Sequence, residues 1–395
     1  MKRVLNLLAI SLITFSAQGQ LEYGFKPSEA RDMIALCNSF TYLDLYDNDQ
    51  EIIPEGYSKE YTSGTFGMDN KFQVYRKNDL VVINLRGSTD KMMSWMENIY
   101  SAMIPAQGTI TMLGNAFKYE FAKDTAAAVH AGYALGIAYM HESLVMQIKY
   151  FNALGVNNFI LTGHSQGGAL AIMLRAYLEN LPQGTLPPNI HYKNYVFANP
   201  MVGNQEFATE YNSRFAATNS SFCIVNPEDP IPKLPITYSE GKFLSPENIT
   251  NLLNGEQVDP KSMLMNLFMH KYHQTVSGYV HGISQSLTNQ ITRELGSVEI
   301  PSYKQDINYK KVNAIMEIEP FEYPLILRDS SILENDSLMA IYKRDEKGIF
   351  YDKRLYQKEP SFFQHKPHNY YVAILKRYFP EEYALLPKKI LDENL

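Results

Sequence analysis

The stretch of sequence that decides the fold reads Phe159-Ile160-Leu161-Thr162-Gly163-His164-Ser165-Gln166-Gly167-Gly168-Ala169-Leu170-Ala171. Its first four residues are an apolar run typical of a strand, and residues 169–178 are strong helix formers. Between them, Gly-His-Ser-Gln-Gly fits the Gly-x-Ser-x-Gly pattern, which presents a serine at a strained turn from strand to helix. The helix N-terminus then points free N–H groups toward developing negative charge. The stretch predicts Ser165 as a nucleophile; the alternative is an ordinary glycine-rich turn.

Strand-like and helix-like segments alternate on both sides of this stretch. Strands are predicted at 71–76, 79–85, 195–198 and 221–225, and helices at about 26–46 and 129–153. The run from Leu80 to Ile83 is continuously apolar, as expected of a strand that is covered on both faces. This alternation is typical of an α/β fold, with a mostly parallel central sheet flanked by crossover helices.

The C-terminal part differs in character and is predicted to hold a long insertion. Residues from about 240 to 364 resemble irregular helices at first and then become polar, charged and rich in tyrosine. A hairpin is predicted there, with strands at 339–344 and 348–355. The last helix is expected to follow His365. We therefore predict a single catalytic domain, residues 20–395, with this insertion before its last helix.

Residues 1–19 fit a secretory signal peptide. Two basic residues precede the apolar run 4–15, and Ala17 and Gly19 form the small-x-small arrangement that signal peptidase accepts. The run is too short to cross a bilayer comfortably, although a buried helix or a membrane anchor is the alternative. No later segment is apolar for long enough to span a membrane. The sequence predicts cleavage before Gln20 and export to the periplasm or the extracellular space.

Charge and cysteine content bear on other functions. The formal net charge is −6 and no basic stripe is present, so binding to nucleic acid is not expected. Histidines and cysteines lack the clustering of a zinc site, and no metal or other cofactor is predicted. The two cysteines, Cys37 and Cys223, lie among apolar neighbours. Either one disulfide or two buried thiols is consistent with the sequence.

The serine stretch resembles the class 3 lipase family, the fungal-type triacylglycerol lipases and their relatives. Four further blocks fit in the family's order, namely Val81–Thr89 with Ser94-Trp95, His130–Tyr133, Phe197–Asn204 and Val225–Pro235. The resemblance covers about residues 71–238. Departures are Gln166, where leucine is usual, and Ala198, where glycine is usual. The resemblance implies an α/β-hydrolase fold and cleavage of carboxylic esters of lipids through an acyl-enzyme.

A serine hydroxyl becomes a good nucleophile when a histidine takes its proton and an acid orients that histidine. Asp229 follows the apolar strand at 222–225, so it lies at a strand's C-terminal end, where a triad acid is expected. The resemblance implies the same residue; the alternative is a turn-forming aspartate. For the histidine, His365 is favoured, because larger family members end in a histidine followed five residues later by a tyrosine. His368 and then His281 remain alternatives.

Two N–H donors must face the carbonyl oxygen as it becomes negative. The backbone N–H of Gln166 is one predicted donor. The resemblance implies Ser88 as the second, with a hydroxyl that can add a hydrogen bond. The alternative is that residues 86–88 form a plain turn at a strand end. The methionine-rich segment 92–105, which includes Trp95, is interpreted either as a lid or as core packing.

These features favour a secreted serine hydrolase that acts on lipid esters, with a lipid–water interface as an expected partner. Triacylglycerol lipase, phospholipase A1 and soluble-ester esterase are not separated by these residues. An acyltransferase, in which an alcohol intercepts the acyl-enzyme, is a further alternative. A secreted binding protein without turnover is a different class, and the pairing of Ser165 with Asp229 argues against it.

Overall fold

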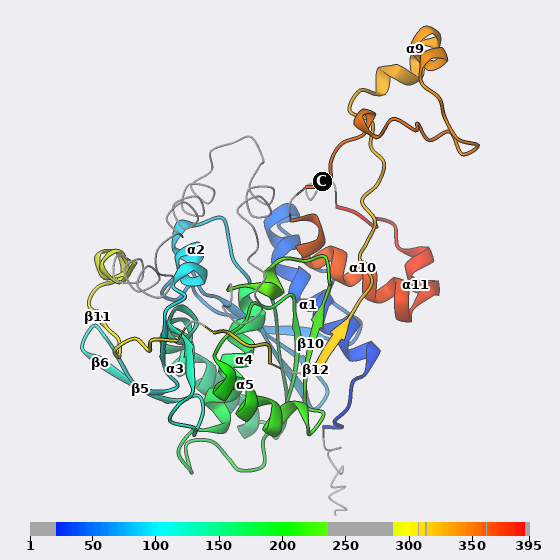
Figure 1. Cartoon of the computed structure of the whole chain (residues 1–395). Coiled ribbons are helices and arrows are strands. Elements are labelled where there is room, and N and C mark those ends of the chain that lie inside the picture. The colour runs from blue at the N-terminus through cyan, green and yellow to red at the C-terminus, as the bar shows by residue number, and fades with distance from the viewer. Residues whose placement is uncertain (1–20, 236–286, 307, 313, 361, 392–395) are drawn as a thin grey trace, which may run out of the picture.

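The computed structural model describes residues 21–235 and 287–391, apart from residues 307, 313 and 361 (Figure 1). The predicted signal peptide, His281 and most of the irregular first half of the predicted insertion lie outside the described residues. In the described part of the chain, no helix has the length and hydropathy needed to cross a bilayer.

A seven-stranded sheet forms the centre of the molecule. Its strands, in spatial order, are β1 (Ser58–Thr62), β2 (Phe72–Lys77), β3 (Leu80–Leu85), β8 (Asn158–His164), β9 (His191–Phe197), β10 (Ser221–Val225) and β12 (Ala314–Glu317). The first three pair antiparallel, and every pair from β3 to β12 is parallel. The predicted α/β fold with a mostly parallel sheet is therefore confirmed.

Helices cover both faces of this sheet. The four longest are α1 (Pro27–Tyr46), α3 (Ala131–Ala153), α4 (Gln166–Glu179) and α10 (Pro367–Tyr378) (Figure 1). Successive side chains of a strand point to opposite faces, so the strands feed two cores. On β3, Val81 and Ile83 pack in the core with α3 and α4, whereas Val82 packs in the core with α1 and α10.

Residues 91–128 fold into short elements beside α3. They are α2 (Met92–Ile99), β4 (Met103–Pro105), β5 (Gln107–Met112), β6 (Asn115–Glu120) and β7 (Ala128–His130). The strands β5 and β6 form a hairpin that β11 (Val298–Glu299) extends to three strands. The helix α5 (Gln205–Tyr211) lies between β9 and β10 in the chain.

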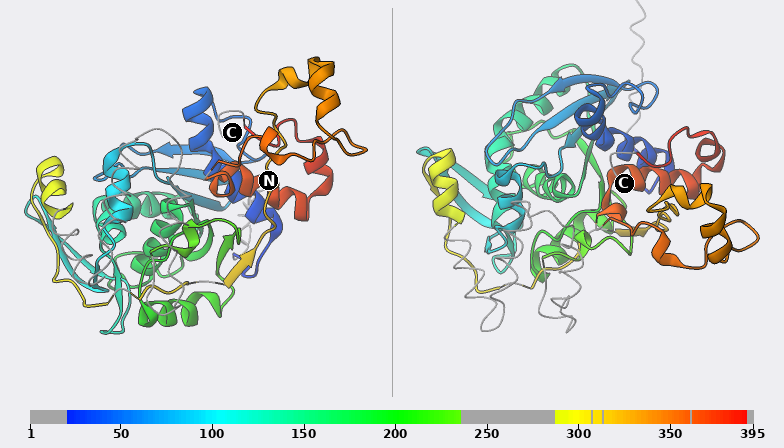
Figure 2. Two further views of the ribbon diagram at one scale, coloured as in Figure 1. Left: turned by 45° about the horizontal axis from the view of Figure 1, so that its top comes forward. Right: turned by 90° about the horizontal axis from the view of Figure 1, so that it is seen from above.

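The range predicted as an insertion also contributes to the sheet, because β12 pairs with β10 at its edge. Its exposure alternates along the strand, because successive side chains point to opposite faces of the sheet. The following residues form an arm that stands clear of the sheet, drawn in orange (Figure 2). The arm has a small core of its own, made of Ile332, Phe350 and Tyr356.

The predicted hairpin at 339–344 and 348–355 is wrong. Residues 336–341 form the helix α9 (Asp336–Ile341), and one isolated antiparallel bridge joins Arg344 to Phe350. Side chains shape this region locally: Asn335 accepts a hydrogen bond from the N–H of Ser337, at 3.0 Å, in the first turn of α9. Such local side-chain bonds compete with the ladder of a hairpin.

The two cysteines are free thiols, both buried. Cys37 lies 3.6 Å from the hydroxyl of Thr162, and Cys223 donates to the amide oxygen of Asn199 at 2.6 Å. Burial raises the pKa of each thiol to about 12. Both groups therefore stay protonated and unreactive at neutral pH.

Candidate active site

The turn between β8 and α4 holds Ser165 in a strained backbone conformation, with φ 58° and ψ −128°. Close packing around it requires glycine at both flanking positions. A Cβ atom at Gly163 would lie 2.3 Å from the carbonyl carbon of Gly167, and one at Gly167 would lie 2.1 Å from the carbonyl oxygen of Leu85. The serine is thus presented where the strand and the helix are nearly in backbone contact.

Three side chains predicted to act together form one hydrogen-bonded line. The Nε2 atom of His365 lies 2.8 Å from the Oγ atom of Ser165, and its Nδ1 atom lies 2.8 Å from Oδ2 of Asp229. Because an ionised carboxylate only accepts hydrogen bonds, the proton of the imidazole sits on Nδ1. The Nε2 atom is then free to accept the proton of the serine hydroxyl.

Asp229 is completely buried, and both of its carboxylate oxygens accept hydrogen bonds. Besides His365, the hydroxyl of Tyr370 donates to its Oδ2 at 2.8 Å, and the N–H of Ile231 donates to its Oδ1 at 2.9 Å. Burial first, and then the charge of Asp229, raises the pKa of Tyr370 well above its ordinary value. The tyrosine therefore remains a donor. Tyr370 is the tyrosine five residues after His365, and its bond to the acid is a contact that was not predicted from the sequence.

The other histidines near the site are placed differently. His368 is buried in α10, and its Nε2 atom lies 3.1 Å from the carbonyl oxygen of Lys388 rather than near Ser165. Burial lowers the pKa of His368 to about 4. His164 packs its ring against that of His365, with 4.8 Å between centroids. Burial, and secondarily His365, lowers the pKa of His164 well below its ordinary value, so it is a neutral neighbour.

The predicted oxyanion residues, Ser88 and Gln166, lie side by side. The hydroxyl of Ser88 donates to Oε1 of Gln166 at 2.8 Å, and Nδ2 of Asn98 donates to the Ser88 hydroxyl at 2.9 Å. A Cβ atom at Gly87 would lie 2.9 Å from the carbonyl oxygen of His164. The loop between β3 and α2 that carries Ser88 (the Ser88 loop) therefore runs directly along the turn between β8 and α4 (the serine turn).

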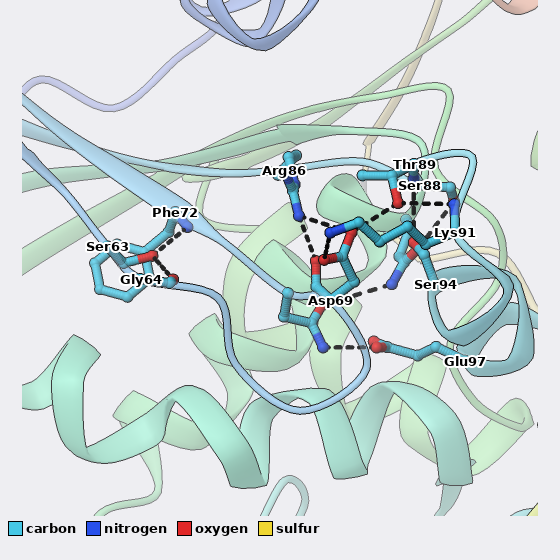
Figure 3. A network of polar contacts seen from close by, with 12 residues as sticks. Ser63, Gly64, Asp69, Phe72, Arg86, Ser88, Thr89, Lys91, Ser94 and Glu97 are labelled. Carbon is cyan, nitrogen blue, oxygen red and sulfur yellow. Dashed lines mark hydrogen bonds and ion pairs between the residues drawn. The ribbon is translucent and has the colours of Figure 1, made fainter. Parts of the chain in front are cut away.

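A buried carboxylate, Asp69, anchors the same loop from the other side (Figure 3). It accepts hydrogen bonds from Arg86 at 2.9 Å, Thr89 at 2.7 Å and Lys91 at 2.8 Å. Burial alone would raise the pKa of Asp69, but the bonds from Lys91 and Thr89 and the charge of Arg86 outweigh it and lower the pKa. The residues on both sides of Ser88 are thereby fixed.

The methionine-rich helix α2 packs over this loop. Met96 is completely buried in the core, while Met92 is 36% exposed. From the same helix, Glu97 points into the polar network (Figure 3), where Nδ2 of Asn70 donates to its Oε2 at 2.6 Å. Burial raises the pKa of Glu97 to about 8, against smaller opposing effects of hydrogen bonds with Asn70 and Gln166. This carboxyl is therefore largely protonated at neutral pH.

We expect the buried Glu97 to make folding stability fall as pH rises. The unfolded chain loses this proton near the ordinary value of 4.5, whereas the folded protein keeps it until about 8. Between these values the native state binds more protons, so its stability is highest below pH 4.5 and declines up to pH 8. Glu97→Gln, a neutral isostere, removes the effect. Asp69 and Tyr133 are the titratable neighbours that the variant leaves in place.

Thermal unfolding at two pH values measures this. The quantity compared is the melting temperature of Glu97→Gln minus that of the unmodified protein. This difference is expected to be higher at pH 8.5 than at pH 5 by on the order of 5 °C. Asp44→Asn is the control, because the pKa of that carboxyl is also raised, but its side chain is exposed in the folded protein. A difference for Glu97→Gln that is the same at both pH values contradicts the assignment of a neutral buried carboxyl.

Comparisons with known proteins found similarity to lipases. A family model described as lipase (class 3) matches residues 82–239. A secreted mono- and diacylglycerol lipase 1 of Fusarium solani is 32% identical over 89 residues, which are 22% of this chain and 24% of that protein. The match thus spans about a quarter of the relative's length.

Solved structures of fungal lipases are also similar. The lipase of Rhizopus microsporus var. chinensis is 18% identical, with a TM-score of 0.40, over 53% of this chain and 69% of its own. The triacylglyceride lipase of Rhizomucor miehei is 20% identical, with a TM-score of 0.38, over 53% of this chain and 74% of its own.

Proposed function

On the premise that residues 82–239 belong to the class 3 lipase family, we propose that this protein is a serine hydrolase that cleaves carboxylic esters of lipids. Ser165 is the nucleophile, His365 the general base and Asp229 the acid that orients it. The single observation that carries the proposal is the continuous line Ser165–His365–Asp229, with both hydrogen bonds at 2.8 Å.

The reaction follows from the geometry of the line. Ser165 Oγ attacks the ester carbonyl while its proton passes to Nε2 of His365, and Asp229 stabilises the imidazolium that forms. The carbonyl oxygen becomes negative and is held by the backbone N–H groups of Gln166 and Ser88. His365 then returns the proton to the leaving alcohol. Water, activated by the same histidine, hydrolyses the acyl-enzyme.

The substrate class is proposed from the family, since the F. solani relative is named as a mono- and diacylglycerol lipase. Triacylglycerol lipase, soluble-ester esterase and phospholipase A1 share this chemistry, as does acyl transfer to an alcohol. Export is part of the proposal and rests on residues 1–19 together with a relative that is named as secreted. A lipid–water interface is the expected place of action.

A fluorophosphonate probe tests the nucleophile. The unmodified protein is expected to be labelled and Ser165→Ala is not. Ser213→Ala is expected to be labelled as before, because Ser213 is an exposed serine that follows α5 and donates to the carbonyl of Glu210. No labelling of the unmodified protein, or unchanged labelling of Ser165→Ala, would refute the proposal.

Rates on p-nitrophenyl esters of increasing chain length then identify the substrate class. A sharp rise once the ester forms an interface is expected of a lipase, whereas a rate that saturates below that concentration identifies a soluble-ester esterase. Adding glycerol separates transfer from hydrolysis, since a transferase yields an acylglycerol in place of the free acid.

A further inference from the structure

The side-chain amide oxygen of Gln166 accepts hydrogen bonds from three donors. This Oε1 atom accepts from the Ser88 hydroxyl at 2.8 Å, the Ser94 hydroxyl at 3.2 Å and Nδ2 of Asn98 at 3.1 Å. Ser94 in turn accepts from the N–H of Thr89 at 3.1 Å. The residue is 1% exposed, so water does not replace these bonds.

The orientation of this amide is determined by a second set of contacts. Its Nε2 atom lies 3.5 Å from Oδ1 of Asn70, whose own Nδ2 donates to Glu97. An amide turned the other way would direct two N–H groups at three donors. Glu97 lies closely against α3, because a Cβ atom at Gly136 would lie 2.4 Å from its Oε1. The acceptor of Gln166 therefore faces the Ser88 loop.

Three of the residues in this network come from one face of α2. Ser94, Glu97 and Asn98 are spaced at i, i+3 and i+4, so their side chains lie on the same side of the helix. The network thus joins three separate elements, which are the serine turn, the Ser88 loop and α2. Leucine, usual at position 166 in the family, can accept none of these bonds.

We propose that the side chain of Gln166 is a positioning group for the oxyanion hole, which holds the Ser88 loop and α2 against the serine turn. The inference rests on the proposed function. In this assignment the backbone N–H of Gln166 contacts the substrate, whereas its side chain acts through Ser88. Asn70 and Glu97 orient the amide. Without the side-chain acceptor of Gln166, both backbone N–H groups remain in the chain, but the distance between them is no longer fixed.

The test is a double-mutant cycle measured on soluble p-nitrophenyl butyrate. Gln166→Met keeps the backbone N–H and nearly the side-chain volume but removes the acceptor, and we expect kcat to fall about tenfold or more, with KM changed less than about threefold. Ser88→Ala removes the main donor. If Gln166 acts through Ser88, the double variant is no slower than the slower single variant within about twofold.

The control is Thr162→Val on β8. Thr162 donates to the carbonyl of Tyr195 at 2.7 Å and its hydroxyl also contacts Cys37, so the variant loses buried hydrogen bonds of β8 but leaves the Ser88 loop unchanged. Its kcat is expected to stay within about twofold of the unmodified value. If Gln166→Met does not fold, Ser94→Ala removes one donor and leaves Gln166 in place, with an expected loss in kcat of about threefold.

The outcomes separate the two proposals. If the unmodified protein hydrolyses the ester while Gln166→Met, or Ser94→Ala in its place, keeps full kcat, the inference is overturned and the proposed function stands. Additive losses in the double variant also overturn it, because they show that Gln166 acts independently of Ser88. If the unmodified protein neither hydrolyses the ester nor reacts with a fluorophosphonate, the proposed function fails and the inference with it.

Discussion

Replacing His365 with alanine is expected to lower kcat on a soluble ester by about ten-thousandfold or more, close to the loss for a serine hydrolase without any base. Ser165 would then lose the acceptor that lies 2.8 Å from its hydroxyl. His164 packs its ring against that of His365, and burial lowers the pKa of His164 well below its ordinary value, so this weakly basic imidazole is a poor substitute for the base. The binding of substrate does not depend on the imidazole, so KM should change little.

His368→Ala is the matched control for this variant. His368 lies three residues further along and is more deeply buried, but it bonds to the carbonyl of Lys388 and not to Ser165. We expect a lower melting temperature, because a buried side chain is removed, and a kcat within about threefold of the unmodified value. A larger loss of kcat in His368→Ala than in His365→Ala would show that the base has been assigned to the wrong histidine.

The choice between these histidines illustrates what the sequence could and could not predict. His365 is 200 residues from Ser165 and 136 from Asp229, so no local pattern links them. What separates the two histidines in the structure is the start of α10. Pro367 begins the helix, which leaves His365 in a short 3-10 turn that can reach the serine, whereas His368 lies inside the helix and faces away.

Local chemistry explains why the centre of the fold was predictable. The stretch from Phe159 to Leu178 combines an apolar run, a glycine turn and helix formers, and it folds as β8, the serine turn and α4. By contrast, β12 lies in a polar tract and becomes a strand because β10 offers it an open edge. A strand that is formed by its neighbour's edge has no strong signal in its own residues.

The Gln166 network was missed for a similar reason. Its partners Ser88, Asn98 and Asn70 lie 78, 68 and 96 residues away in the sequence. A signal was nevertheless present, because a polar residue stood where the family usually has leucine and where burial is expected. A buried amide needs partners, and that requirement pointed to further polar residues around the turn.

Asp229→Asn is expected to lower kcat by about ten-thousandfold while leaving the fold intact. The site offers Asp229 three donors, from Ile231, Tyr370 and His365, and an asparagine has one oxygen with which to accept them. If this oxygen stays with Ile231, the new NH2 group faces His365 and Tyr370. The imidazole must then accept at Nδ1 and carry its proton on Nε2, where it can no longer take the proton of Ser165.

Two comparisons check that the effect arises from the tautomer of His365. Tyr370→Phe removes one donor to the carboxylate but keeps the charge and the bond to His365, so we expect a loss of kcat of about tenfold or less. The loss in Asp229→Asn should also shrink as pH rises, because hydroxide can then deprotonate Ser165 in place of the histidine. Equal losses in Asp229→Asn and Tyr370→Phe, or no loss in Asp229→Asn, would show that Asp229 does not orient the base.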